Sequence, residues 1–507
     1  MIAGNGPDRS PEERAGREAR PAALLATPIP PLRTGLATYA IRVLESTGDM
    51  AEWTVAYPPG GDPSLLPHGV AGSFELGADG QLPDCVRIPE IRIFQLGNSP
   101  DCFPLTRMLY RTGGTTILHE LGLHHMLRFC YLRDGDIEEY GRELAFEYGP
   151  AAASVEKLLA EPRSEKDYDS LLKRYPLIGR AIHYSDRIAC LNPFASAALR
   201  SRAGMREVLE IGHPLSPVDR AEEPSPSLMP GSPLVGMLGS NRPGRGLEHL
   251  LGALARLRRG WPSMGLVLLG SGYPEKNLPE WVRSAGRLPE AEYQGWIRML
   301  DLAVDVRSPH CGETSGSLLE ALRAGIPAVV SSGGSFDYLP SDAVLRIPAE
   351  SIGSALAPAI DLLLSDGGLR SRMARSAALY ASDVGSRDRL RSDWSRLLEP
   401  AAPASGEHGP LPQPALSAAW HGPLFGMGID SGQPAVSWRF DGRAEIALPA
   451  WALPPVFLTV TGEGRVLAGD TEHVLTGDPV VLRIEGSARP VLDGRGLVTQ
   501  ITWRNEG

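Results

Sequence analysis

The sequence is poor in cysteine and has no long apolar run. Its 507 residues include 5 cysteines, an odd number, and none of them forms a Cys-x-x-Cys pair. A disulfide framework or a zinc site is therefore not expected, whereas a reducing, cytoplasmic compartment is. No window approaches about eighteen uninterrupted apolar residues, so no membrane span is predicted, and contact with a membrane surface stays open.

Basic clusters and a signal peptide are also missing. The formal net charge is −10 and no long run of Lys or Arg occurs. A nucleic acid partner is not expected, because phosphate backbones are bound by clustered cations. Residues 1–20 have no apolar core of the kind that a signal peptide needs, and they are predicted to form a polar, disordered leader.

What the sequence does contain is an alternation of apolar and amphipathic segments, which occurs twice. In residues 21–212, AALLATPIP, WTVAYP and TTILHEL are expected strands and TGLATYAIRVLES is an expected helix. This order predicts strand–helix–strand units and a parallel sheet, with a charged helical insertion at 131–180. A Pro- and Ser-rich linker is predicted at 213–233, and a second series of the same kind occupies 234–398.

The last part of the chain has a different pattern. A second linker, rich in Pro and Ala, is predicted at 399–416. Residues 417–507 alternate short apolar runs with Gly-containing turns, which predicts a small all-β sandwich or jelly roll. The expected fold is therefore α/β, with two Rossmann-like domains that face a cleft and a small C-terminal all-β domain.

The most informative segment is SPHCGETSGSLLEALRAGIPAVV, which begins at Ser308. It predicts a polar loop with Gly312 and Gly316, then a helix. The first turn of such a helix offers unpaired N–H groups and a positive dipole end, which suit a diphosphate. Glu320 lies about one turn into the helix, where a carboxylate can accept both hydroxyls of a ribose. On local chemistry alone, a capped helix with an outward glutamate explains the segment at least as well.

This segment resembles the signature of the retaining glycosyltransferases of family 4, which have the GT-B fold, in the Gly-Glu-Thr-Ser-Gly form of a bacterial subgroup. The family has two glutamates, then Ala, a Gly-x-Pro and a Val-rich strand. Glu313 and Glu320 match these glutamates, with six residues between them where the family has seven. The resemblance implies that Glu320 binds the ribose and that Glu313 binds the donor sugar or nearby backbone. It also implies that the diphosphate lies at Gly312, Thr314, Ser315 and Gly316.

Other segments follow in the order of the family. VGMLGSNRPGRGLEHLLGAL resembles the segment that brings cations to the donor phosphates; Arg245 stands where the family has Lys, and Arg242 substitutes for a second cation. PIPPLRTGLATYA resembles the N-terminal glycine loop, with Gly35 as the best match. FQLGNS and ILHELGLHH resemble the region that delivers a histidine, His119, to the donor sugar. Without the family order, a lone histidine at a strand end is more often structural.

The resemblance implies a hexosyltransferase that needs no metal or cofactor and acts in polysaccharide biosynthesis. Its donor would be a UDP- or GDP-sugar and its acceptor a glycan, lipid or small molecule. His119, Glu313 and Arg245 are the expected catalytic residues. HELGLHH is one residue too long for a His-Glu-x-x-His zinc motif. Two alternatives stay open: another GT-B enzyme, such as a sugar-nucleotide epimerase or a phosphorylase, and a non-catalytic glycan-binding or assembly protein, which the short glutamate spacing favours.

Overall fold

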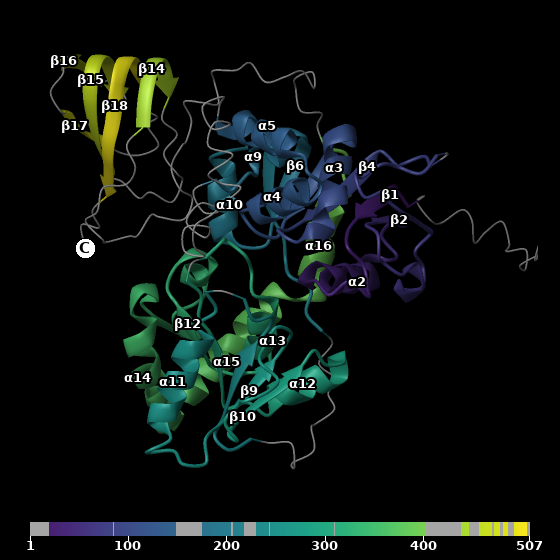
Figure 1. Cartoon of the computed structure of the whole chain (residues 1–507), viewed down its shortest axis with the longest axis vertical. Coiled ribbons are helices and arrows are strands. Elements are labelled where there is room, and N and C mark those ends of the chain that lie inside the picture. Colours follow the sequence, from purple (N-terminus) through teal and green to yellow (C-terminus); the bar gives the residue numbers. More distant parts are fainter. Residues whose placement is uncertain are drawn as a thin grey trace, which may run out of the picture.

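The computed structural model has two α/β domains, each built on a parallel sheet, which stand one above the other in Figure 1. The structure describes residues 20–84, 86–148, 175–203, 206–216, 230–242, 244–308 and 310–401, together with the backbone of five C-terminal strands. The prediction of two Rossmann-like domains is confirmed.

The first domain contains a seven-stranded sheet in the order β3-β2-β1-β4-β5-β6-β7. Its strands are parallel because helices return the chain across its two faces. Central strands such as β1 are almost entirely buried, which explains their unbroken apolar sequence. The strands are β1 (Ala22–Ala26), β2 (Glu52–Tyr57), β3 (Gly72–Glu75), β4 (Ile91–Leu96), β5 (Gly114–Leu118), β6 (Ser185–Cys190) and β7 (Glu207–Glu210).

The helices of the first domain enclose two apolar clusters, one on each face of the sheet. They are α2 (Gly35–Thr47), α3 (Phe103–Thr112), α4 (His124–Arg133), α5 (Ile137–Tyr148), α9 (Gly179–His183) and α10 (Pro193–Arg200), with short 3-10 helices at Pro63–Leu65 and Pro100–Cys102. Helix α5 lies within 131–180, where a helical insertion was predicted, and α4 and α9 overlap the two ends of that range. Part of that insertion, 149–174, lies outside the described residues.

The second domain contains a six-stranded parallel sheet in the order β10-β9-β8-β11-β12-β13. Its strands are β8 (Leu234–Leu238), β9 (Gly265–Leu269), β10 (Val282–Gly286), β11 (Leu302–Asp305), β12 (Ala328–Ser331) and β13 (Val344–Ile347). Its helices are α11 (Leu247–Leu257), α12 (Glu290–Arg298), α13 (Gly316–Arg323), α14 (Ile352–Ser365) and α15 (Gly367–Val384), with 3-10 helices at Gly334–Tyr338 and Ala349–Ser351. The strand order reverses between β8 and β11, so the edge above these two strands is the place where such sheets bind ligands.

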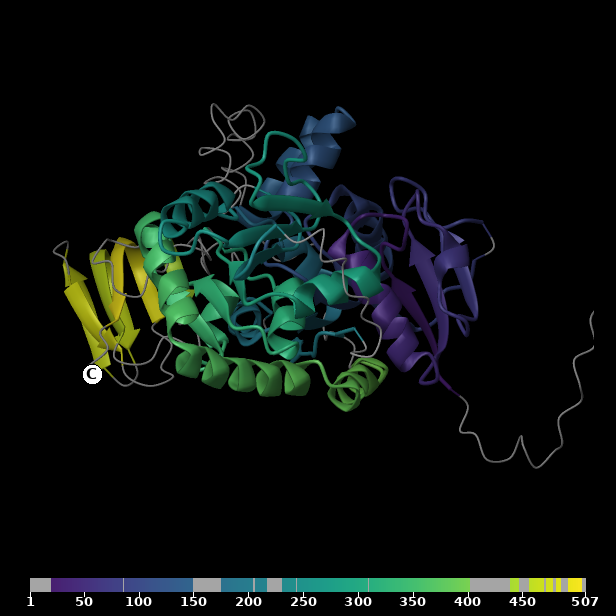
Figure 2. The ribbon, with the colours of Figure 1, turned by 90° about the horizontal axis from the view of Figure 1, so that it is seen from below.

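The chain returns to the first domain through α16 (Arg387–Leu397). Figure 2 shows α15 running along the second domain and leading to α16, which lies beside α2. The Trp394 ring packs edge-on against Trp53 at 5.8 Å between centroids, and Arg391 pairs with Asp49 at 2.6 Å. The two domains are thus joined by this helix as well as by the connection after β7.

Five antiparallel strands form a separate sheet near the end of the chain. They are β14 (Trp438–Glu445), β15 (Val456–Ala468), β16 (Thr471–Thr476), β17 (Val480–Ile484) and β18 (Val491–Trp503). The sandwich or jelly-roll architecture stays a prediction, and both predicted linkers fall largely on residues outside the described ranges. In the described part of the chain, no single helix is long and apolar enough to cross a membrane. Among the described residues, one bent pair of helical segments, Ala349–Ser365 and Gly367–Leu397, passes that test when its two members are counted together.

Candidate functional site

The predicted glycine-containing loop connects β11 to α13 at the carboxyl edge of the second sheet. Ser315 caps α13: its hydroxyl accepts from the Leu318 N–H at 3.4 Å and donates to Asp305 at 2.5 Å. Gly312 has a φ of 72°, and a Cβ there would lie 2.7 Å from Leu121 of the first domain. Both its backbone conformation and the close approach of the two domains therefore require glycine. The predicted helix N-terminus is confirmed.

A buried charge network centred on Asp305 lies beneath this loop. The Asp305 carboxylate is 2.7 Å from Nη1 of Arg245 and 3.1 Å from Nε of Arg307. Burial raises the pKa of Asp305, but the two guanidinium groups and Ser315 outweigh it and hold that pKa below its usual value. Because Ser315 of the loop and both arginines bind the same Asp305 carboxylate, this network ties the loop to the end of β11.

Arg245, predicted as a phosphate ligand, belongs to this network. Its side chain is 5% exposed, and it donates to Asp305 and to the Leu238 carbonyl. Its guanidinium therefore faces the inside of the second domain. Direct contact of Arg245 with a phosphate stays a prediction, and such contact requires the side chain to leave Asp305.

Glu313 extends the network to the surface of the loop. Its Oε1 lies 2.6 Å from Nη1 of Arg307, and its Oε2 accepts from the Cys311 N–H at 2.7 Å. Burial raises the pKa of Glu313, yet Arg307 and then Arg242 outweigh burial and lower that pKa to about 2. The Arg242 side chain is 53% exposed and lies 3.7 Å from Glu313, so this predicted cation remains accessible to a ligand.

Glu320 is more deeply buried than Glu313, with a side chain 2% exposed, and its partners differ. Its Oε1 accepts from Arg42 of α2 at 2.8 Å and from the Ser216 N–H at 2.9 Å, and its Oε2 accepts from Arg323 at 3.1 Å. Arg42 pairs with Glu290 as well, at 3.1 Å. The carboxylate that was predicted to bind a ribose is therefore engaged by the first domain and by the connection between the domains. Its role toward ribose stays a prediction.

On the first domain, His119 follows β5 at the carboxyl edge of the sheet. The Tyr39 ring packs edge-on against His119 at 4.7 Å and against His213 at 5.3 Å. Burial lowers the pKa of His119 to about 3 and that of His213 to about 4, so both rings are neutral at neutral pH. Nε2 of His119 is buried and has no hydrogen-bond partner among the described residues. His213 in turn lies against Gly316, where a Cβ would come 2.8 Å from its ring.

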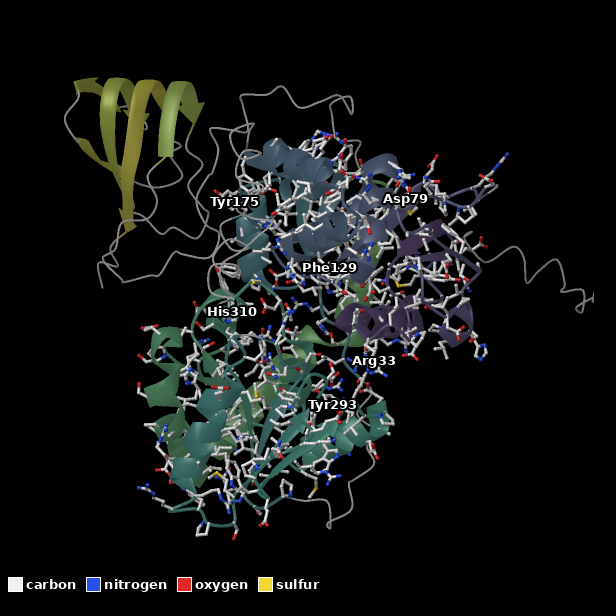
Figure 3. The ribbon with its side chains drawn as sticks, in the orientation of Figure 1. Arg33, Asp79, Phe129, Tyr175, Tyr293 and His310 are labelled. Atoms are coloured by element: carbon white, nitrogen blue, oxygen red, sulfur yellow. The ribbon has the colours of Figure 1, made fainter. Side chains whose placement is uncertain are left out.

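The carboxyl edges of the two parallel sheets meet directly. The Leu121 N–H donates to the Cys311 carbonyl at 2.8 Å, which brings the segment after β5 against the loop before α13. Figure 3 shows His310, from the same loop, at the side of the second domain that faces the first. Glu120 lies at this junction: its Oε1 accepts from the Asn98 N–H at 3.0 Å, and burial raises its pKa while Arg242 opposes the rise.

Several of these residues were missed by the sequence analysis: Glu120, Asp305, Arg307 and Arg42. Asp305 and Glu120 each stand at or just beyond the end of a buried strand, the position at which parallel sheets carry functional groups. That position was a usable signal. No local pattern marks Arg42, because its partners, Glu290 and Glu320, are distant in the sequence.

Gly35 begins α2, and Thr34 caps that helix by accepting from the Ala37 N–H at 3.1 Å. A Cβ at Gly35 would meet nothing within 4 Å, so the space beside it is open. His124, the second histidine of HELGLHH, is buried with its Nε2 2.7 Å from the Tyr140 hydroxyl. In the described parts of the chain, no group of three or more His, Cys, Asp or Glu side chains could hold a metal ion.

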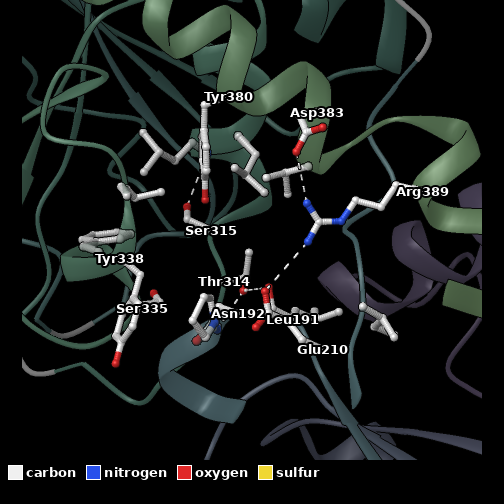
Figure 4. Close-up of a pocket in the computed structure, with 17 residues that line it drawn as sticks. Leu191, Asn192, Glu210, Thr314, Ser315, Ser335, Tyr338, Tyr380, Asp383 and Arg389 are labelled. Atoms are coloured by element: carbon white, nitrogen blue, oxygen red, sulfur yellow. Dashed lines mark hydrogen bonds and ion pairs between the residues drawn. The ribbon is translucent and has the colours of Figure 1, made fainter. Parts of the chain in front are cut away.

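A pocket of about 220 Å³ lies elsewhere between the two domains (Figure 4). It shares Thr314 and Ser315 with the loop but includes none of the other predicted site residues. Arg389 on its wall pairs with Asp383 at 3.3 Å and lies 3.9 Å from Glu210. A ligand in this pocket would therefore touch the loop before α13 through Thr314 and Ser315, but would not touch Arg242 or His119.

Comparison with known proteins gives one partial sequence match and several structural ones. No family model matches the chain. Over 155 residues it is 31% identical to the phosphatidyl-myo-inositol mannosyltransferase of Propionibacterium freudenreichii subsp. shermanii, which covers 30% of this chain and 39% of that protein. The chain thus spans about two fifths of the length of this curated relative.

Among solved structures, sucrose-phosphate synthase from Thermosynechococcus elongatus matches with a TM-score of 0.52 and 15% identity, over 75% of this chain and 98% of that one. Anabaena HepE, in complex with UDP and glucose, matches with a TM-score of 0.48 and 15% identity, over 74% of this chain and 99% of HepE. The chain therefore has the two-domain, GT-B-like fold of sucrose-phosphate synthase, and part of its sequence is similar to a phosphatidyl-myo-inositol mannosyltransferase.

Proposed function

We propose that the protein is a glycosyltransferase that moves a sugar from a nucleoside-diphosphate sugar to an acceptor. One observation carries this proposal: the Leu121–Cys311 hydrogen bond joins the carboxyl edges of the two sheets. It brings Arg242 and Glu313 of one domain to the same junction as His119 of the other. Ligand sites of α/β sheets lie at such edges and between such domains.

The groups at this junction suit the departure of a diphosphate. The first amides of α13 and the exposed Arg242 guanidinium carry positive charge where the diphosphate would lie. Preorganised donors of this kind contribute about 3 kcal/mol each to the stabilisation of developing negative charge. Glu313, held ionised by Arg307, can only accept hydrogen bonds, as the hydroxyls of a donor sugar require.

The remaining assignments extend this proposal. Neutral His119 has a buried Nε2 that no described residue hydrogen-bonds, which suits a sugar hydroxyl. Glu320 binds the ribose after Arg42 moves aside, and Arg245 acts by fixing Asp305 until it turns toward a phosphate. Gly35 leaves room for the donor or the acceptor.

The finer features of the reaction rest on the family resemblance. The donor is a UDP- or GDP-sugar, the acceptor is a glycan or lipid-linked molecule, and the anomeric configuration is retained. The leaving phosphate assists the attack, and neither a metal nor a cofactor takes part. The reaction takes place in the cytoplasm, with contact to a membrane surface where the acceptor is a lipid.

The test is a thermal-shift screen of the full chain against UDP, GDP, ADP and their sugars, followed by mass spectrometry of reaction products. We expect one nucleotide to raise the unfolding temperature and its sugar to appear on an acceptor. Arg242→Ala and Glu313→Gln should reduce transfer, and Arg142→Ala, which breaks an exposed ion pair with Glu138 within α5, is the matched control. If both loop variants turn over every donor as well as the control does, the site is wrong.

A second candidate function is supported by the ion pairs that Glu320 and Arg245 form within the protein. Because Glu320 is engaged by Arg42 and Arg245 by Asp305, the site also suits a non-catalytic sugar- or nucleotide-binding protein. Tight binding of UDP or GDP with neither transfer nor donor hydrolysis would favour this candidate. Isomerisation of the nucleotide sugar in the absence of an acceptor would instead indicate an epimerase.

A further inference from the structure

The peptide groups of the donor loop are held from outside the loop, and in part by the other domain. Three consecutive carbonyls are bound: Cys311 by the Leu121 N–H at 2.8 Å, Gly312 by the Asn192 side chain at 2.9 Å, and Glu313 by the Ser335 hydroxyl at 2.7 Å. Asn192 and Leu121 belong to the first domain. Since the carbonyl and the amide of one peptide point in opposite directions, fixing these carbonyls also fixes where the loop amides point.

Asn192 stands two residues after the end of β6, and both its amide oxygen and its amide nitrogen form hydrogen bonds. Its oxygen caps α10 by accepting from the Ala195 N–H at 2.8 Å. Its nitrogen donates both to the Gly312 carbonyl and to the Thr314 hydroxyl, each at 2.9 Å. The Thr314 hydroxyl in turn donates a hydrogen bond to the Leu191 carbonyl at 3.1 Å, so each of these donors has an acceptor. Figure 4 shows Asn192 and Thr314 in contact where the two domains meet.

The residue type is informative because a helix cap alone does not require asparagine. Asp caps helices about as well but has no donor, and the single hydroxyl of Ser or Thr cannot make two donated bonds while it caps a helix. Asn192 is 7% exposed, so a lost partner there would leave buried polar atoms unpaired. The side chain at this position therefore serves the loop of the other domain as well as its own helix.

We infer that Asn192 is a positioning residue, which sets the orientation of the Gly312–Thr314 peptides so that the loop is correctly shaped only when the two domains are together. This inference deepens the proposed function and depends on it for the kinetic part of the test. Opening of the domains would release two of the three bound carbonyls at once. Donor binding and domain closure are thereby coupled through this asparagine.

The test compares Asn192→Ser, which keeps a capping oxygen and loses the two donated bonds, with Asp366→Asn as the matched control. Asp366 caps the exposed start of α15 by accepting from the Leu369 N–H at 2.8 Å and has no role in the loop. The first readout is hydrogen exchange of the amides in 310–317. We expect faster exchange of this segment in Asn192→Ser, with the sheets protected as in wild type, and no change of this segment in the control.

The second readout is kinetic. Asn192→Ser should lower kcat/KM for the donor about 10- to 100-fold, the equivalent of one or two lost buried hydrogen bonds, while KM for the acceptor stays unchanged. Thr314→Val removes the other partner, and the double variant should cost less than the two single costs combined.

Exchange of 310–317 that stays at the wild-type rate in Asn192→Ser would overturn the inference. A uniform rise of exchange across the first domain would overturn it too, because that result marks loss of a helix cap alone. If the wild-type protein neither binds nucleotide nor transfers sugar, the proposed function fails, whereas hydrogen exchange still tests Asn192.

Discussion

The loop before α13 and the body of α13 each hold one glutamate engaged by arginines, and the two are stabilised in different ways. The Glu313 side chain is held by Arg307 and the Cys311 N–H, both within the second domain. Glu320 is held by Arg42 of the first domain and by Ser216 in the connection between domains. The geometry of Glu313 is therefore set when one domain folds, whereas that of Glu320 depends on how the two domains meet.

The largest effect is expected when the support of Glu313 is removed. Asp305→Asn leaves Arg245 and Arg307 buried without their shared carboxylate, which should lower the free energy of unfolding by about 3–5 kcal/mol. Urea unfolding measures this change. Asp49→Asn, which breaks the exposed pair with Arg391, should cost less than about 1 kcal/mol. Equal losses in the two variants would show that the network does not support the loop.

The stabilisation from Glu313 should depend on pH. Its pKa is about 2 when folded against 4.5 for a free glutamate. A carboxyl whose pKa falls on folding stabilises the protein above pH 4.5, and this stabilisation is lost as pH falls from 4.5 towards 2. It amounts to at most about 3 kcal/mol. Glu313→Gln should therefore be less stable than wild type at pH 7, with a gap that narrows below pH 4.5.

The control for that measurement is Glu138→Gln, which removes an exposed carboxylate 3.1 Å from Arg142. Its unfolding curve should follow that of wild type throughout the acid range. A Glu313→Gln curve that stays parallel to wild type down to low pH would mean that Glu313 is not held ionised by Arg307.

Arg42→Gln should change the surroundings of Glu320 and leave those of Glu313 unchanged. This change removes the ion pairs of Arg42 with Glu320 and Glu290 and should lower the free energy of unfolding by about 1–3 kcal/mol. The loss is limited because Arg323 still neutralises Glu320. If the ribose of the donor competes with Arg42 for Glu320, calorimetry should show tighter nucleotide binding in this variant. Binding should be weaker in Glu320→Gln. Unchanged affinity in both variants would exclude Glu320 from the nucleotide site.

The smallest effect on stability is expected for Arg242→Ala. The side chain is half exposed and lies 3.7 Å from Glu313, so the free energy of unfolding should change by less than about 0.5 kcal/mol. Its effect should instead appear as a raised KM for the donor. A large loss of stability without any kinetic change would make Arg242 a structural residue.

The fold was predictable from the sequence because strands covered on both faces leave continuous apolar runs. AALLA and GLVLL are examples, and both are central strands. The short edge strand β3, with the sequence GSFE and a half-exposed pattern, gave no such signal and was missed. Helix α13 was placed correctly because a serine cap and a glycine pair precede its apolar face.

The residues of the loop were predictable, but their partners were not. The position of Glu313 followed from motif order, yet its ion pair with Arg307 depends on side-chain directions after β11. The engagement of Glu320 by Arg42 joins residues 278 positions apart, and only the packing of the two domains creates it. Such contacts leave no local pattern in one sequence.

The central claim is that the loop Gly312–Gly316 and Glu320 form the nucleotide-sugar site. Its most direct test is a crystal structure of the full chain with UDP or GDP bound. The diphosphate should lie on the first amides of α13 near Arg242, with the ribose on Glu320 and Arg42 displaced. A nucleotide bound in the pocket beside Tyr338 and Arg389, or a nucleotide site away from both glutamates, would contradict the claim.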